Sequence, residues 1–142
     1  MDVQNRYWWD ETCGLPVESY ARDFTDSEDY RGINAAMHTV EAYLAVADVT
    51  GDLAWLTRAV QVIDFAVNVR ARANDWRLPE HYDARWRPLL DYNKDQPAHP
   101  FRPYGVTPGH GLEWARLTVQ ARAALVARSL PVPDWMLDAA EE

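Results

Sequence analysis

Apolar side chains recur at helical spacing in three long stretches, at about residues 33–50, 53–73 and 109–128. Residues three, four and seven positions apart share one face of an α-helix, so each stretch predicts an amphipathic helix. The apolar stripes are Met37, Val40, Leu44 and Ala47 in the first stretch and Leu53, Leu56, Val60, Ile63 and Val67 in the second. The apolar positions of the third stretch are Leu112, Ala115, Leu117, Val119, Ala123, Leu125 and Val126. The pattern as a whole predicts an antiparallel helical array.

The residues between these stretches predict where the helices begin and end. Gly51 can close a helix in the left-handed conformation, and Asp52 is a favourable N-cap, so the first two helices should form a tight antiparallel hairpin. Pro108 fits the first turn of the third helix, where a missing N–H costs nothing. A proline-rich break follows that helix, and Asp134 is expected to cap a short fourth helix that begins at Trp135.

Two parts of the chain lack the helical pattern. Aromatic and β-forming residues on either side of a turn at residues 10–14 predict a short N-terminal β-hairpin. Residues 74–107 are irregular and rich in proline, and so long a loop inside a compact domain tends to be functional. Its Trp, Tyr, Arg and His residues suit a sugar pocket, because aromatic faces pack on sugar C–H groups while polar side chains bind hydroxyls.

Composition and charge narrow the range of partners. The 142 residues suit one domain or part of one, and 48% of them are hydrophobic, enough for a core. A net charge of −8 argues against nucleic acids and anionic membranes as partners. No apolar stretch approaches the roughly 20 residues that span a bilayer, and the polar N-terminal residues do not resemble a signal peptide. The single cysteine, Cys13, fits a reducing compartment, so we expect a cytoplasmic protein.

The start of the third predicted helix carries the strongest candidate chemistry. His110, Glu113 and Trp114 are spaced i, i+3 and i+4, so they are expected to share one helix face. An imidazole with a carboxylate one turn away can accept and return a proton near neutral pH. His110 is therefore a candidate acid/base and Glu113 the candidate residue that orients it. The alternative is a half-buried helix whose histidine and tryptophan only pack.

A second polar face is expected on the first helix, where Asn34, His38 and Glu41 recur at helical spacing. Polar stripes are usually solvated surface, but this one is small and has no lysine, as in the wall of a pocket. His81 and His99 are each flanked by turn residues, and we expect structural roles for both.

The same histidines permit a competing hypothesis of a metal site. His38 and Glu41, like His110 and Glu113, form an i, i+3 pair, and two such pairs on facing helices can hold a metal. A hard-metal site needs more carboxylates than the sequence gathers here, so we predict no metal.

Several blocks in unbroken order, over about residues 5–140, resemble the N-acylglucosamine 2-epimerase superfamily. Within it they are most similar to the aldose–ketose isomerase branch, the mannose isomerases and sulfoquinovose isomerases. The blocks are Arg31-Gly-Ile-Asn-Ala-Ala-Met-His-Thr-Val-Glu-Ala42, Glu80-His-Tyr-Asp83 with Trp86, Asp91-Tyr-Asn-Lys-Asp95, Pro97, Phe101-Arg-Pro-Tyr-Gly105, and Pro108-Gly-His-Gly-Leu-Glu-Trp-Ala-Arg-Leu117.

The resemblance implies an all-α fold, an (α/α)6 barrel of six inner and six outer helices with a sugar pocket at one end and no metal or other cofactor. It implies that His38 and His110 line that pocket, and that Asn34, Arg102, Glu113 and Trp114 belong to its binding wall. In the family a pair of histidines moves protons, one between C2 and C1 of the sugar through an enediol while the other helps to open the ring. His110 matches one of the pair, and the other would lie beyond residue 142. Ala36 departs from the pattern of the family, in which Asn is common beside the Met-His pair.

Three helices and a stub are about a third of such a barrel, together with the hairpin and the aromatic loop. We therefore expect residues 1–142 to form a single partial barrel domain, a fragment inactive alone that associates with the missing segments or with further copies. The expected substrate is a small sugar of the mannose or sulfoquinovose type. The alternatives are an N-acylglucosamine 2-epimerase-type or cellobiose epimerase and, from another class, a non-catalytic protein-interaction module.

Overall fold

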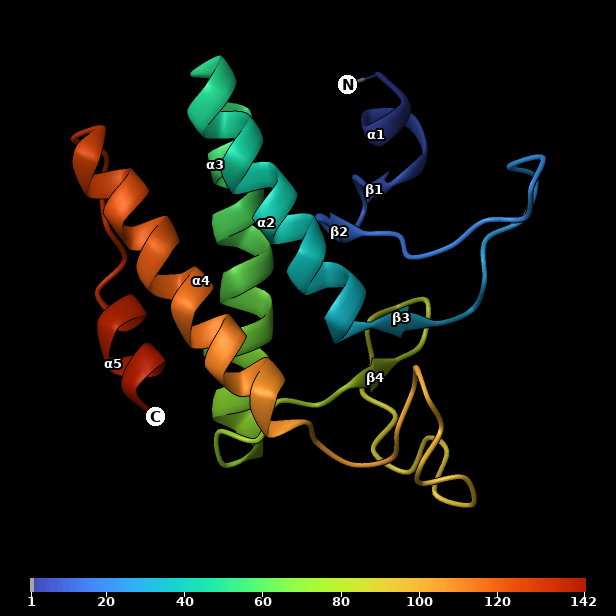
Figure 1. Ribbon diagram of the computed structural model, residues 1–142. Coiled ribbons are helices and arrows are strands. Elements are labelled where there is room, and N and C mark those ends of the chain that lie inside the picture. Colours follow the sequence, from blue (N-terminus) through green and yellow to red (C-terminus); the bar gives the residue numbers. More distant parts are fainter. Residues whose placement is uncertain (1) are drawn as a thin grey trace.

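The computed structural model describes residues 2–142, and three long helices carry its fold (Figure 1). These are α2 (Ile33–Thr50), α3 (Leu53–Ile63) and α4 (Pro108–Ala127). Helix α3 runs on into a π-helical segment, η1 (Asp64–Ala71), and a 3₁₀ turn, η2 (Arg72–Asn74). Two short helices, α1 (Asp2–Tyr7) and α5 (Trp135–Glu141), lie towards the two ends of the chain. The mostly helical fold expected from the sequence is confirmed.

The helical hairpin forms as the sequence predicts. Gly51 closes α2 with a φ of 71°, and its N–H donates to the Ala47 carbonyl. The Asp52 side chain accepts the Ala54 N–H at 3.0 Å and so caps α3. Both contacts satisfy backbone groups that helix ends leave free.

Helix α4 lies across the α2–α3 hairpin, and α5 packs against α4 and η1 (Figure 1). The buried stripes of these helices meet in one core, because each presents an apolar face to the others. Among the largest fully buried side chains are Ile33, Met37, Leu44, Leu56, Ile63, Trp114, Leu117 and Met136.

Two very short antiparallel ladders stand beside the helices. The predicted N-terminal hairpin is present, with β1 (Trp9–Asp10) paired to β2 (Leu15–Pro16). A second ladder, which the sequence pattern did not predict, pairs β3 (Arg31–Gly32) with β4 (His81–Tyr82). The Ile33 N–H also donates to the Glu80 carbonyl at 3.0 Å. This ladder therefore fixes the start of α2 against the long loop between η2 and α4.

Two local predictions differ from the structure. The second helix is not α-helical throughout, because η1 occupies its C-terminal half. Asp134 does not cap α5: its backbone is already helical, and its side chain makes no capping hydrogen bond. Among residues 2–142, no helix is both long and apolar enough to cross a membrane.

Candidate active site

A cavity of about 940 Å³ opens where α2 and α4 begin. Its walls come from the first turn of α2, the first turn of α4, the segment around β4 and the loop from Tyr92 to Thr107. Asn34, Arg102 and His110, three of the residues predicted to act on a sugar, line this cavity. The volume and the mixture of aromatic, amide and charged groups suit a small polar ligand.

His110 is held in the cavity wall by a carboxylate. Its Nδ1 lies 2.8 Å and 3.1 Å from the two oxygens of Glu80. Glu80 is almost fully buried, with a side chain 4% exposed, and its Oε1 also accepts the Thr107 N–H at 2.8 Å. A carboxylate can only accept, so Nδ1 carries the proton, and Nε2 of the neutral imidazole keeps its lone pair. The pair thus has the geometry of a general base whose orientation and tautomer are fixed by a buried acid.

Glu113 does not have the orienting position that the spacing predicted. It is half-buried one turn beyond His110, and in the described chain its side chain makes no hydrogen bond or ion pair. The partner of His110 is instead Glu80, thirty residues away in sequence. The reason is tertiary: β4 and the loop after η2 bring Glu80 to the first turn of α4, where it binds both His110 and the Thr107 N–H.

His38 lies outside the cavity in this structure, although Asn34 on the same helix lines it. The His38 side chain is 60% exposed, and its Nδ1 is 2.8 Å from Glu41, which Arg116 of α4 also binds. Four residues advance a helix by about 6 Å, so His38 stands one turn further from the cavity than Asn34 does.

Trp114 is also placed differently from the expected binding wall. Its side chain is 1% exposed and begins the buried stripe of α4, which continues through Leu117 and Ala121. It lines a separate, mostly apolar cavity of about 380 Å³ between α4, η1 and α5. Its indole is large and apolar, so the helical core takes it.

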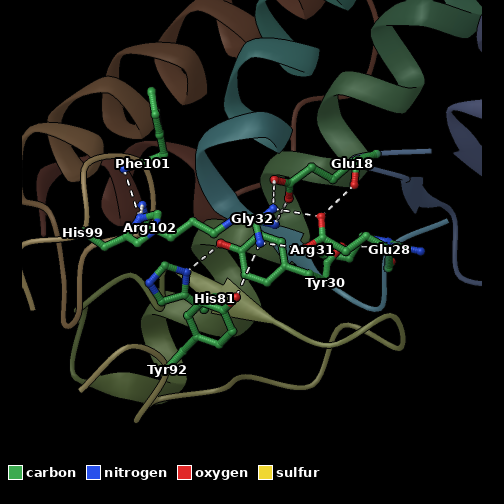
Figure 2. Close-up of polar contacts among 11 residues, drawn as sticks. Glu18, Glu28, Tyr30, Arg31, Gly32, His81, Tyr92, His99, Phe101 and Arg102 are labelled. Atoms are coloured by element: carbon green, nitrogen blue, oxygen red, sulfur yellow. Dashed lines mark hydrogen bonds and ion pairs between the residues drawn. The ribbon is translucent and has the colours of Figure 1, made fainter. Parts of the chain in front are cut away.

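Arg102 lines the cavity and is tied to the opposite loop (Figure 2). Its guanidinium donates to both oxygens of Glu28, at 2.7 Å and 2.9 Å, and lies 3.8 Å from the centroid of the Tyr30 ring. The Glu18 carboxylate is 3.8 Å away. These contacts hold Arg102 rigidly on the cavity wall.

His81 and His99 make structural contacts, as their turn-rich surroundings predicted. His81 Nε2 donates to the Pro103 carbonyl at 2.7 Å, and Nδ1 accepts the Tyr30 hydroxyl at 2.7 Å (Figure 2). Burial lowers the pKa of His81, which favours this neutral form. His99 accepts the backbone N–H of Arg102 at 3.0 Å and so shapes the loop.

The structure does not gather the two i, i+3 pairs into a metal site. In residues 2–142, no group of three or more His, Cys, Asp and Glu side chains is placed to hold an ion. The two histidines use their Nδ1 atoms on different carboxylates, Glu41 and Glu80.

Sequence reasoning missed Glu80, Glu28 and Glu18 as members of this site. Glu80 precedes His81 within a block that also marks the resemblance, and that position was its only signal. Glu28 and Glu18 lie in segments with no periodicity, so only the folded structure shows that they approach Arg102.

The fold and the cavity together define a class of protein. They form an array of antiparallel helices with a polar cavity at one end and a histidine–carboxylate pair in its wall, an arrangement suited to proton transfer on a small polar ligand.

The chain belongs to the N-acylglucosamine 2-epimerase (GlcNAc 2-epimerase) family, whose model matches residues 1–142. It is 46% identical over 140 residues to a D-mannose isomerase of Pseudomonas cannabina pv. alisalensis, covering 99% of this chain and 34% of that protein. It is 49% identical over 139 residues to a D-mannose isomerase of Thermobifida fusca, covering 98% of this chain and 33% of that protein. The chain thus spans about a third of the length of these relatives.

Solved structures agree with this family. A crystal structure of D-mannose isomerase superimposes with a TM-score of 0.88 at 32% identity, covering 99% of this chain and 34% of that one. A cellobiose 2-epimerase from Spirochaeta thermophila superimposes with a TM-score of 0.71 at 16% identity, covering 99% of this chain and 33% of that one, and shows the shared fold alone. The helical array is therefore a part of the barrel found in these enzymes.

Proposed function

We propose that this chain forms the His110 side of the active site of an aldose–ketose isomerase that acts on mannose-type sugars. The observation that carries the proposal is the His110–Glu80 pair in the wall of a cavity large enough for a hexose. The similarity to proteins named D-mannose isomerase supports the choice of sugar.

In the proposed reaction, His110 acts through Nε2. Nε2 removes the proton from C2 of the open-chain aldose, and the electron pair forms the C1–C2 double bond of an enediol as O1 takes up a proton. Loss of the O2 proton and return of the first proton to C1 then give the ketose. Glu80 stabilises the imidazolium that exists between the two transfers, and acid/base help of this kind contributes roughly 10²–10⁴-fold in rate.

Other residues are assigned supporting parts in this proposal. Asn34 and Arg102 donate hydrogen bonds to sugar hydroxyls from the cavity wall. His38, exposed and fixed by Glu41, and Glu113 face ligand groups that extend beyond the cavity. Because the chain spans a third of its relatives, we further propose that residues outside this chain complete the pocket, through a longer polypeptide or an association of chains.

A 2-epimerase is the second candidate, because the family is named for that reaction and the same base could act at C2. Return of the proton to the opposite face of C2 would then give an epimer instead of a ketose. Sulfoquinovose-type sugars are a further candidate substrate of the isomerase, and the charge around Arg102 bears on that choice.

A chimera provides the test. This chain replaces the matching third of the Thermobifida fusca D-mannose isomerase, and proton NMR in D₂O with a chelator follows D-mannose. We expect fructose and deuterium at C1 or C2 with the chimera, and a loss of about 10³-fold with His110→Gln. Glu11→Gln is the matched control, because it removes a carboxylate that does not line the cavity. Near-unchanged turnover by His110→Gln would overturn the assignment, and epimer without ketose would favour the second candidate.

A further inference from the structure

Arg102 is the one arginine among the residues lining the cavity, within the part of the chain that the structure describes, and its charge is already engaged. Two parallel hydrogen bonds join it to the Glu28 carboxylate, at 2.7 Å and 2.9 Å. Such a bidentate contact is the strongest arrangement that a guanidinium makes with a carboxylate. Glu28 does not line the cavity, so it approaches Arg102 from behind the wall.

The other groups in contact with Arg102 are an aromatic ring, a phenol hydroxyl and a second carboxylate. One face of the guanidinium lies over the Tyr30 ring at 3.8 Å, and Nη1 also donates to the Tyr92 hydroxyl at 3.4 Å. Glu18 lies 3.8 Å from Nη2 and is itself half-buried (Figure 2). The lining of the cavity also includes Glu80, so carboxylates outnumber arginine on these walls.

The two carboxyl groups near Arg102, those of Glu28 and Glu18, differ in how readily they ionise. Hydrogen bonds from Arg102, and a further one from Ser19, lower the pKa of Glu28, so that carboxylate is ionised at neutral pH. Burial raises the pKa of Glu18, so its ionised form is the less favoured of the two. Glu28 is therefore the residue that balances Arg102.

We propose that Glu28 determines substrate charge specificity: by cancelling the charge of Arg102, it makes this wall a hydrogen-bond donor for neutral sugars and a poor site for sulfonated or phosphorylated ones. The inference rests on the proposed function, because it takes the cavity to be the sugar site. The guanidinium keeps its Nε–H, which makes no hydrogen bond within the described chain and can serve a hydroxyl group. An anionic group in the cavity would instead meet the Glu18 and Glu80 carboxylates on its walls. The nearby cation of Arg31 is buried outside this lining, where its guanidinium donates to the Glu28 and Tyr30 carbonyls.

The first test needs no turnover. The protein, labelled with ¹⁵N-arginine, is titrated with sodium sulfate at constant ionic strength, and the Nε–Hε signal of Arg102 is followed. We expect no saturable shift in the natural sequence and a saturable shift in Glu28→Gln. Glu28→Asp, which keeps the charge, should behave as the natural sequence does. Glu11→Gln is the matched control, because it removes a carboxylate from another arginine, Arg58, outside this cavity.

Saturable sulfate binding at Arg102 in the natural sequence, or the same flat response in Glu28→Gln, would overturn the inference. Glu28 has an exposed side chain, and the circular dichroism spectrum of each variant checks its fold. The chimera supplies the second test, as the ratio of affinities for D-mannose and D-mannose 6-phosphate. Glu28→Gln should shift this ratio about tenfold towards the phosphorylated sugar, as expected for one partly screened charge.

The two proposals can fail separately. A chimera without isomerase activity, together with sulfate binding that appears only in Glu28→Gln, would remove the proposed function and keep the charge assignment. An active chimera whose preference between D-mannose and D-mannose 6-phosphate is unchanged by Glu28→Gln would keep the proposed function and remove the charge assignment.

Discussion

Residues 2–142 contain two histidine–carboxylate pairs of the same length in very different settings. His110 and Glu80 are 2.8 Å apart, come from segments thirty residues apart, and the carboxylate is 4% exposed. His38 and Glu41 are also 2.8 Å apart, but they lie one turn apart on the surface of α2. A short local pair on an exposed helix contributes little to stability or chemistry, whereas a buried pair sets tautomer and orientation. Distance alone therefore does not distinguish the two pairs, and burial and sequence separation make His110–Glu80 the candidate catalytic pair.

Replacing Glu80 by Gln should give the largest effect after His110 itself. The amide can still accept a hydrogen bond, but it no longer stabilises the imidazolium, so we expect kcat in the chimera to fall about 10²-fold with little change in KM. Glu80→Asp should recover part of the loss. If the fall in kcat, expressed as a free energy, is no larger than the loss in the free energy of unfolding, Glu80 is only structural. Glu41→Gln is the matched change in the exposed pair.

His38→Gln should have a smaller effect, because His38 stands outside the cavity. We expect a loss of about tenfold in kcat/KM, the size of one lost hydrogen bond to a polar ligand group, and a change in unfolding free energy below about 1 kcal/mol. Steady-state kinetics of the chimera and urea unfolding measure the two quantities. A loss as large as that of His110→Gln would mean that the two pairs are functionally equal and that the comparison is misleading.

His81 provides a third case for comparison with His110 and His38. It is buried, and its hydrogen-bond partners are the Tyr30 hydroxyl and the Pro103 carbonyl instead of a carboxylate. Its pKa is lowered by burial, so the unfolded chain binds the proton more readily than the folded chain does. The contribution to stability is therefore complete above about pH 6.5, the usual histidine value, and declines as the pH falls below it. Urea unfolding at pH 7.5 and 5.5 should show a smaller drop for His81→Gln than for the natural sequence. An equal or larger drop in the variant would contradict this.

The helices could be predicted because their signal is local. The limits of α2 and the Gly51–Asp52 turn follow from periodicity and end chemistry, and both predictions are confirmed. The β3–β4 ladder could not be predicted in this way, because two-residue strands carry no periodic signal and their partners are far apart in sequence.

The candidate site shows the same difference between local signals and contacts that are far apart in sequence. Helical spacing pointed to His110 and to the face of α2 that carries Asn34, and both residues line the cavity. This signal is local, because it depends on a single helix turn. The carboxylates that hold His110 and Arg102 depend on where loops fold back, so spacing favoured Glu113 over Glu80. Trp114 shows a further limit: sharing a helix face with His110 in sequence did not prevent the core from taking the larger apolar ring.

The π-helical segment η1 has a consequence for how insertions and deletions would act in this chain. A π-helical turn contains more residues than an α-helical turn, as if the helix had absorbed additional chain. Removing one residue from Asp64–Ala71 would favour ordinary α-helical winding, which absorbs the deletion and leaves the direction of the downstream chain nearly unchanged. Removing one residue from the α-helical part, Leu53–Ile63, would instead rotate the chain that follows it by about 100°. We therefore expect the segment that leads to Glu80 to tolerate a one-residue deletion in η1 better than one in α3.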